Sequence, residues 1–259
     1  MSVEVHATAD GPGGDADTPT VVLSGSLGSD LGMWYPQVGP LVEAGYRVVR
    51  YDHRGHGASP VPNGPYSMAD LGGDAVALLD ALRLGPVHWV GLSLGGMVGM
   101  WLGKHAGDRL ASLTLCCTSA ALDPTPWAER TKVVRARGTT AVAGAVVDRW
   151  LTPEYAEAHP ETVRWMRGMI EATPDEGYAS CCTAIATMDL AGGLGSIATP
   201  TLVLAGERDP ATPPGHGRRI AETIPGARFA IVGQAAHLAN VECADEVNRY
   251  LIEHVKETA

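Results

Sequence analysis

The sequence predicts an α/β fold in which a mainly parallel central sheet carries helices on both faces. Short apolar runs typical of buried strands alternate with stretches at helical spacing, which is the pattern of repeated β-α-β units. From Pro126 to about Leu190 no strand-like run occurs. With 259 residues, the chain suits one large domain of this class. We therefore expect a core of residues 1–120 and 195–259 and an inserted helical cap of residues 121–194.

The core elements are expected in strand and helix order along the chain. Glycine- and proline-containing turns separate the apolar runs, and Ser67 has the side chain of a residue that starts a helix. We predict strands at 3–7, 20–23, 46–51, 87–90, 110–117, 201–205 and 228–232, and helices at 33–43, 67–82, 97–102 and 241–255.

The cap is expected to hold three or four helices. Thr125-Pro126, Thr152-Pro153 and Thr173-Pro174 each place a capping threonine before a proline suited to the first helical turn. Because this block lies between two stretches of parallel sheet, we expect it to cover the active-site edge. The alternative is an extra packed helical layer without a gating role.

Composition argues against several classes of protein. Hydrophobic residues make up 45% of the chain and charged residues 19%, which argues against disorder. A net charge of -10 argues against nucleic acid or an anionic membrane surface as a partner. The first residues lack a signal-peptide pattern and no apolar run could cross a bilayer, so a cytoplasmic protein is expected. Five cysteines without C-x-x-C spacing favour reduced, buried thiols over disulfides or a zinc site, and no cofactor motif appears.

Gly91-Leu92-Ser93-Leu94-Gly95 joins a predicted strand to a predicted helix through a sharp turn. Glycines two residues before and after Ser93 allow the strand and the helix to come close. The serine hydroxyl would then lie at a helix N-terminus, where free amides favour the negative charge of acyl transfer. This pattern predicts a nucleophile elbow; the alternative is a glycine-rich turn with an idle serine.

Two later residues could complete a catalytic triad with Ser93. Asp209 follows the strand at 201–205, and His237 follows the strand at 228–232. The carboxyl ends of parallel strands meet at one edge of a sheet, where open α/β sheets place their sites. A histidine would act as the base and an acid would hold its tautomer. Glu207 is the rival acid, but Asp209 lies deeper in its loop.

Four stretches carry a resemblance to a known family. They read L-S-G-S-L-G-S-D-L-G-M-W, Y-D-H-R-G-H-G-A-S-P-V-P-N-G-P-Y, G-L-S-L-G-G-M-V-G and A-A-H-L-A-N-V-E. The chain resembles 3-oxoadipate enol-lactonases of the α/β-hydrolase superfamily through nearly its whole length, least in the cap. It departs from them at Gly25, where the family usually has asparagine, and in the double cysteines of the cap.

The α/β-hydrolase pattern places two amides around a developing oxyanion. One is the amide of Leu94, next after the nucleophile, and by position the other is the amide of Ser26. This loop often carries a histidine, where Ser24 stands here, so its supporting hydrogen bonds need another source. His53 and His56 lie in a loop that could approach the site or could serve only in loop hydrogen bonding.

The resemblance implies hydrolysis of a small, carboxylate-bearing enol-lactone to 3-oxoadipate in aromatic-compound catabolism, the beta-ketoadipate pathway. Ser93 would attack the ring carbonyl with His237 as base and Asp209 as its partner, through an acyl-enzyme and without a cofactor. The alternatives are a general carboxylesterase or perhydrolase-like enzyme, a carbon-carbon hydrolase, and a small-molecule sensor.

An acidic protein that binds an anionic substrate needs a local cation. Trp127 and Arg130 share one face of the first predicted cap helix, and an apolar ring beside a planar double donor suits a flat, carboxylated lactone. The alternative is a solvated basic face. Arg54 is the other candidate cation, and Trp34, at the end of the S-L-G-S-D-L-G-M-W segment, is a further candidate contact.

Overall fold

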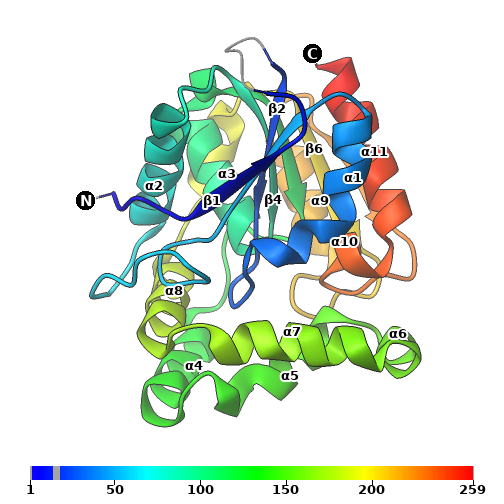
Figure 1. Cartoon of the computed structure of the whole chain (residues 1–259). Coiled ribbons are helices and arrows are strands. Elements are labelled where there is room, and N and C mark those ends of the chain that lie inside the picture. Colours follow the sequence, from blue (N-terminus) through cyan, green and yellow to red (C-terminus); the bar gives the residue numbers. More distant parts are fainter. Residues whose placement is uncertain (1, 14–17, 259) are drawn as a thin grey trace.

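A seven-stranded sheet forms the centre of the molecule in the computed structural model, which describes residues 2–13 and 18–258 (Figure 1). The strand order is β1-β3-β2-β4-β5-β6-β7; β1 runs antiparallel to β3 and the other neighbours are parallel. The strands are β1 (Ala7–Asp10), β2 (Thr20–Ser24), β3 (Arg47–Tyr51), β4 (Val87–Leu92), β5 (Leu110–Cys116), β6 (Thr201–Gly206) and β7 (Arg228–Val232).

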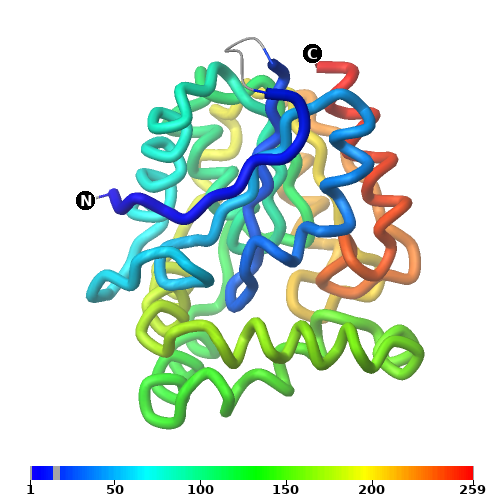
Figure 2. The backbone as a smooth tube through the Cα atoms, in the orientation of Figure 1, coloured from blue at the N-terminus to red at the C-terminus, as the bar shows by residue number. Residues whose placement is uncertain are grey.

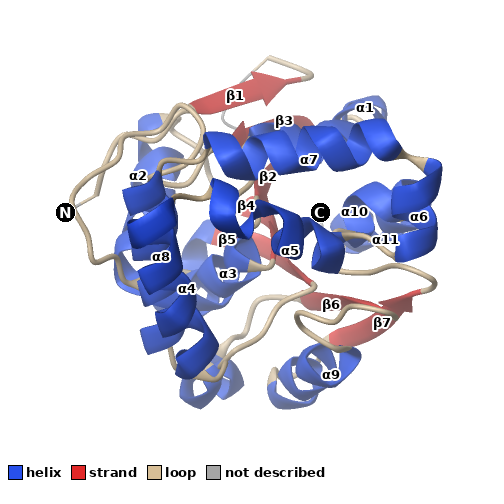
Figure 3. Cartoon of the chain, turned by 90° about the horizontal axis from the view of Figure 1, so that it is seen from below, coloured by secondary structure: helices blue, strands red, loops and turns tan. Residues whose placement is uncertain are grey.

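Helices cover both faces of the sheet, which confirms the predicted fold class (Figure 3). One face carries α2 (Met68–Ala81), α3 (Leu94–His105) and α9 (Pro214–Thr223). The other carries α1 (Tyr35–Glu43) and α11 (Ala244–Glu257), which lie side by side although they come from opposite ends of the sequence (Figure 2). Short helical turns, Leu31–Trp34 before α1 and α10 (Ala239–Glu242) before α11, interrupt the helices predicted at 33–43 and 241–255.

Five helices follow β5 and lie together below the carboxyl ends of the parallel strands (Figure 1), and we use the word cap for this group of helices. The expectation of three or four was wrong because residues 153–172 form two helices, with His159-Pro160 between them. A proline is suited to a first helical turn, so Pro160 begins a new helix where the apolar periodicity continues. The helices are α4 (Pro124–Arg137), α5 (Thr140–Trp150), α6 (Pro153–Ala158), α7 (Pro160–Ala172) and α8 (Asp175–Thr187).

The threonine-proline pairs mark a capped helix start in one case of three. The Thr152 hydroxyl caps α6. Asp123 caps α4 instead, since its carboxylate accepts the amide of Thr125 at 2.9 Å. Thr173 donates to the carbonyl of Met169 (2.9 Å), and α8 begins without a side-chain cap. The expectations at Thr125 and Thr173 were therefore wrong. The Asp123 carboxylate caps α4, and the Thr173 hydroxyl binds the end of α7 and not the start of α8.

The first strand begins later than its pattern indicates. The alternation at 3–7 predicts a strand there, but β1 starts at Ala7. The amide of Val3 donates to Asp74 Oδ1 (2.7 Å) and that of His6 to Ser59 Oγ (2.8 Å). Val5 is buried. Packing thus explains the apolar alternation, while side chains rather than a neighbouring strand take these amides.

The order of the strands reverses between β2 and β4. The chain passes from β2 outward to β3 and then returns to the other side of β2 with β4. The loops that follow β2 and β4 therefore separate on opposite faces and leave a crevice, which is where open α/β sheets bind ligands. A hydrogen bond from the amide of Gly95 to the carbonyl of Gly25 (2.9 Å) joins these two loops.

Two predictions from composition can be compared with the structure directly. All five cysteines are free thiols, and four of them are buried. Burial raises the pKa of Cys116 to about 12, so this thiol stays protonated at neutral pH. No helix of the described residues has the length and apolar character needed to cross a membrane.

The close approach at Gly95 gives a first testable prediction. A Cβ at this position would collide with the carbonyl of Ser24, a backbone atom that cannot move away cheaply. We expect Gly95→Ala to cost roughly 3 kcal/mol or more in the free energy of unfolding, the scale of backbone strain and overpacking. Chemical denaturation measures this. Gly73→Ala is the control, since open space surrounds that helical glycine, and the change should stabilise by about 0.5–1 kcal/mol. Equal effects of the two substitutions would contradict the prediction.

Candidate active site

Ser93 stands between β4 and α3 in a strained backbone conformation. Its φ is 54° and its ψ is -111°, in a region that a side chain with a Cβ rarely adopts. Gly91 and Gly95 permit this turn, because a Cβ on either one would strike backbone atoms of the facing segment. The Ser93 amide donates to the Cys116 carbonyl (2.9 Å) and Thr118 Oγ1 donates to the Ser93 carbonyl (2.7 Å). The strained residue is therefore held from both sides.

Asp209 and His237 form a buried pair at the ends of β6 and β7. His237 Nδ1 lies 2.8 Å from Asp209 Oδ2. The same carboxylate accepts the amides of Ala211 (2.8 Å) and Thr212 (3.0 Å) and the Thr212 hydroxyl (2.8 Å). Burial opposes the charge of Asp209, but attraction to His237 and these hydrogen bonds outweigh it, so the pKa of Asp209 lies below its usual value. Asp209 is thus a carboxylate at neutral pH and fixes the orientation of the imidazole.

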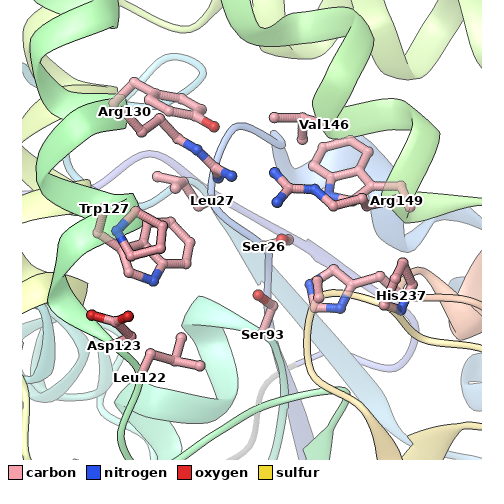
Figure 4. A pocket seen from close by; sticks show the side chains of 15 residues that line it. Ser26, Leu27, Ser93, Leu122, Asp123, Trp127, Arg130, Val146, Arg149 and His237 are labelled. Atoms are coloured by element: carbon pink, nitrogen blue, oxygen red, sulfur yellow. The ribbon is translucent and has the colours of Figure 1, made fainter.

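Ser93 and His237 both line a cavity of about 220 Å³, which lies between the strand ends and the cap helices. Figure 4 shows the Ser93 hydroxyl and the His237 ring next to one another at the base of this cavity. Glu207, the rival acid, is exposed and accepts the amide of Gln234 (2.9 Å). The structure therefore brings Ser93, His237 and Asp209 together and leaves Glu207 outside.

The two amides expected around an oxyanion differ in their partners. Among the described residues, none accepts a hydrogen bond from the amide of Leu94, the first residue of α3. The amide of Ser26 donates to Met33 Sδ at 3.2 Å. A thioether is a weak acceptor, so a developing oxyanion would compete with it easily. Met33 was not singled out from the sequence, because nothing in the L-G-M-W pattern shows which way its sulfur points.

His53 and His56 support the loop that carries Ser26. His53 Nε2 donates to the carbonyl of Gly25 (3.1 Å), and His56 Nε2 accepts the amide of Gly28 (2.9 Å). Burial lowers the pKa of each imidazole to about 4, so both rings are neutral at neutral pH. The loop after β2 lacks the histidine that often supports it. The two hydrogen bonds from His53 and His56, in the loop after β3, supply that support.

Trp127 and Arg130 lie on the cavity wall formed by α4 (Figure 4). The Arg130 guanidinium lies 4.6 Å from the centre of the Trp127 ring, a cation–π distance. Lys132 pairs with Glu129, and Arg135 with Glu176, on the outer surface. The face predicted from helical spacing is therefore the face turned towards the cavity.

Four cavity residues from other cap helices were missed. Val146, Arg149 and Trp150 come from α5, and Tyr178 comes from α8. The available signal was the Arg149-Trp150 pair at the end of a largely apolar helix, since an arginine beside a tryptophan there has no obvious solvated face. Tyr178 offered no signal, because its role depends on how the cap helices pack.

Trp34 and Arg54 do not line the cavity. Arg54 is buried and binds Asp74 through two hydrogen bonds of 2.5 and 2.6 Å, with Asp70 Oδ1 at 3.6 Å. Trp34 is fully buried in the core. A guanidinium neutralised by a buried carboxylate is poorly placed to anchor a substrate, so neither expectation is carried forward.

A serine at a strand-to-helix elbow, beside a histidine held by a buried aspartate, defines the class of α/β hydrolases. The model for the alpha/beta hydrolase fold matches residues 19–143, and the model for TAP-like proteins matches residues 179–257. The chain belongs to the α/β-hydrolase superfamily.

Several relatives carry this assignment. The chain is 38% identical to 3-oxoadipate enol-lactonase 2 of Acinetobacter baylyi, over 88% of this chain and 85% of that protein. It is 39% identical to the crystal structure of the enol-lactonase from Burkholderia xenovorans LB400, with a TM-score of 0.94 and coverage of 97% and 96%. It is also 32% identical to a putative carbamate hydrolase, RutD, of Variovorax paradoxus, over 98% and 95%. These similarities place the chain in the family of the 3-oxoadipate enol-lactonases and identify it as a hydrolase.

The contacts of Asp209 give a second testable prediction. Asp209→Asn removes the charge that stabilises the His237 cation and favours the wrong imidazole tautomer, so kcat should fall by about 10³–10⁴. Steady-state hydrolysis of p-nitrophenyl acetate measures it. Glu207→Gln is the matched control on the same loop and should leave kcat nearly unchanged. A larger loss in the Glu207 variant would move the role to that residue.

Proposed function

We propose that the chain is a serine hydrolase that opens a small enol-lactone bearing a free carboxylate, converting 3-oxoadipate enol-lactone to 3-oxoadipate. The observation that carries this proposal is the cavity itself, in which Ser93 and His237 face a cap wall with an aromatic ring and a guanidinium. Its volume suits a small substrate. The two relatives named enol-lactonases support the same substrate class. The reaction would serve the catabolism of aromatic compounds.

The mechanism follows from the positions of the proton carriers. His237 takes the proton of the Ser93 hydroxyl as the oxygen attacks the ring carbonyl, and Asp209 stabilises the imidazolium. The amides of Leu94 and Ser26 stabilise the oxyanion. Collapse of this intermediate breaks the ring C–O bond and expels an enolate, which takes the proton from the His237 imidazolium and becomes the 3-oxo group. Water, deprotonated by His237, then cleaves the acyl-enzyme and restores the serine.

Hydrolysis of a carbamate is the second candidate, because the RutD relative matches nearly the whole chain. The same serine, histidine and oxyanion donors would serve that reaction, so only substrate recognition distinguishes the two. A general esterase would use the same groups as well. The substrate's free carboxylate is the feature that separates the enol-lactone from simple esters.

A comparison of substrates tests the proposed function. The panel contains the enol-lactone, isomeric muconolactones, a small carbamate and p-nitrophenyl acetate, each measured as kcat/KM. We expect the enol-lactone to be preferred by well over tenfold. A preference below about tenfold, equivalent to about 1.4 kcal/mol, would reduce the proposal to a general hydrolase.

The nucleophile and base give a third prediction. Ser93→Ala and His237→Ala should each lower kcat by several orders of magnitude. The double variant should be little worse than either single one, since the two groups act as a unit. Single-turnover assays with enzyme in excess over substrate give these rates. Losses that multiply in the double variant would show that the two residues act independently.

Arg130 gives a fourth prediction. Arg130→Ala should lower kcat/KM for the carboxylated lactone. The loss should correspond to about 2 kcal/mol of binding free energy in the transition state, the scale of a charge-assisted hydrogen bond. Activity on a neutral aryl ester should hardly change. Arg137→Ala, an exposed position on the same helix, is the control and should affect neither substrate. Equal losses on both substrates, or none, would exclude Arg130 as the carboxylate anchor.

A further inference from the structure

Two guanidinium groups from different cap helices converge on the cavity. Arg130 comes from α4 and Arg149 from α5, and both line the wall opposite the base of the cavity. Figure 4 shows the two groups pointing towards each other above Ser93. Each side chain is half-buried, so water screens their mutual repulsion only in part.

No carboxylate among the described residues forms an ion pair with either group. Two exposed arginines of the same group of helices do form such pairs, Arg135 with Glu176 and Arg167 with Glu171. Burial and the repulsion from Arg130 lower the pKa of Arg149, which is the expected result of placing two cations together in a partly enclosed space. The arrangement is unfavourable in the empty cavity and becomes favourable when an anion lies between the two groups.

Among the described residues, one acidic side chain lines the cavity, and it does not neutralise this pair. Asp123 is exposed and caps α4 by accepting the amide of Thr125 (2.9 Å). In Figure 4 it lies on the same side as Trp127 and away from Arg149. The field at the arginine end of the cavity is therefore positive, although the whole protein carries a net charge of -10.

The hydroxyl of Tyr178 adds a third donor. Tyr178 is fully buried and lines the cavity. Its hydroxyl lies beside the Arg130 guanidinium, but it makes no hydrogen bond of good geometry to any of the described residues. Burial raises the pKa of Tyr178 to about 12 against the opposing charge of Arg130, so the hydroxyl keeps its proton. A buried hydroxyl whose hydrogen bonding is incomplete costs free energy, and a ligand oxygen would reduce that cost.

We propose that Arg149, Arg130 and Tyr178 form one carboxylate-binding subsite at the cap end of the cavity. The carboxylate lies between the two guanidinium groups and accepts the tyrosine hydroxyl. The ester carbonyl of the same molecule then reaches Ser93 at the other end. The inference rests on the proposed function only for the identity of the bond that is broken. It assigns a ligand class, a small carboxylate with an ester group at its far end, and this class does not require the lactone.

This subsite selects substrates by charge. A neutral ester leaves two facing cations without a counter-ion, whereas a carboxylated ester neutralises both at once. Arg149 is therefore a specificity-determining residue equal in weight to Arg130. Loss of either arginine should abolish most of the preference for carboxylated esters, because the remaining guanidinium would bind the carboxylate alone.

The test measures binding to the Ser93→Ala protein, so that no turnover intervenes. The ligands are monomethyl adipate, which has one carboxylate and one ester, and dimethyl adipate, its neutral counterpart. Isothermal titration calorimetry gives both dissociation constants. We expect the monoester to bind at least about tenfold more tightly than the diester. Adding Arg149→Met should weaken the monoester by at least about tenfold and leave the diester unchanged. Arg149→Lys should be intermediate and Tyr178→Phe should give a smaller loss.

The control is Arg137→Met, an exposed arginine on α4, which should change neither dissociation constant. Diester binding and the thermal midpoint verify that each variant is folded. If Arg149→Met fails to fold, Arg149→Lys and Tyr178→Phe carry the same test. An unchanged monoester affinity in the Arg149 variants, or equal weakening of both ligands, would overturn the subsite. Neither ester is an enol-lactone, so this result stands apart from the turnover panel.

Discussion

The site depends on one close approach between backbones, where the first turn of α3 meets the loop after β2. The amide of Gly95 donates to the carbonyl of Gly25 at 2.9 Å, and His53 donates to the same carbonyl from the loop after β3. This contact holds the amides of Leu94 and Ser26 on the two sides of one crevice. It also explains why the strained conformation of Ser93 persists, since the surrounding backbone leaves no space for the turn to relax.

Most of the core could be predicted because its signals are local. The strand at 228–232 agrees with β7 at both ends, and Ser67 caps α2 through a reciprocal pair of hydrogen bonds with Asp70. Local signals failed where a partner distant in sequence decided the outcome. Asp74 and Ser59 take the amides that β1 would otherwise have used. In the cap, the count of helices failed because apolar spacing runs through a break that only Pro160 marks.

The candidate site divides in the same way. Ser93, Asp209 and His237 each follow a strand, and chain order together with the parallel sheet suffices to bring them to one edge. Arg54 could not be excluded by such reasoning, because its buried partner Asp74 lies twenty residues later on a helix. Tyr178 could not be found at all. The pairing of Trp127 with Arg130 indicated the cavity face of α4, but the face of α8 that meets the cavity depends on how the five helices pack against one another.

In the proposed function, the groups that break the bond and the groups that recognise the substrate come from different parts of the chain. The serine, the imidazole and the oxyanion amides come from loops at the ends of strands, whereas both lining arginines come from cap helices. Neutral His53 and His56 support the core loops without adding charge. A substitution in α4 or α5 can therefore change the charge that the cavity presents to a substrate, while the elbow and its hydrogen bonds stay as they are. The electrostatic selectivity that we propose would follow from that arrangement, with the core supplying the catalytic groups and the cap supplying the counter-ions.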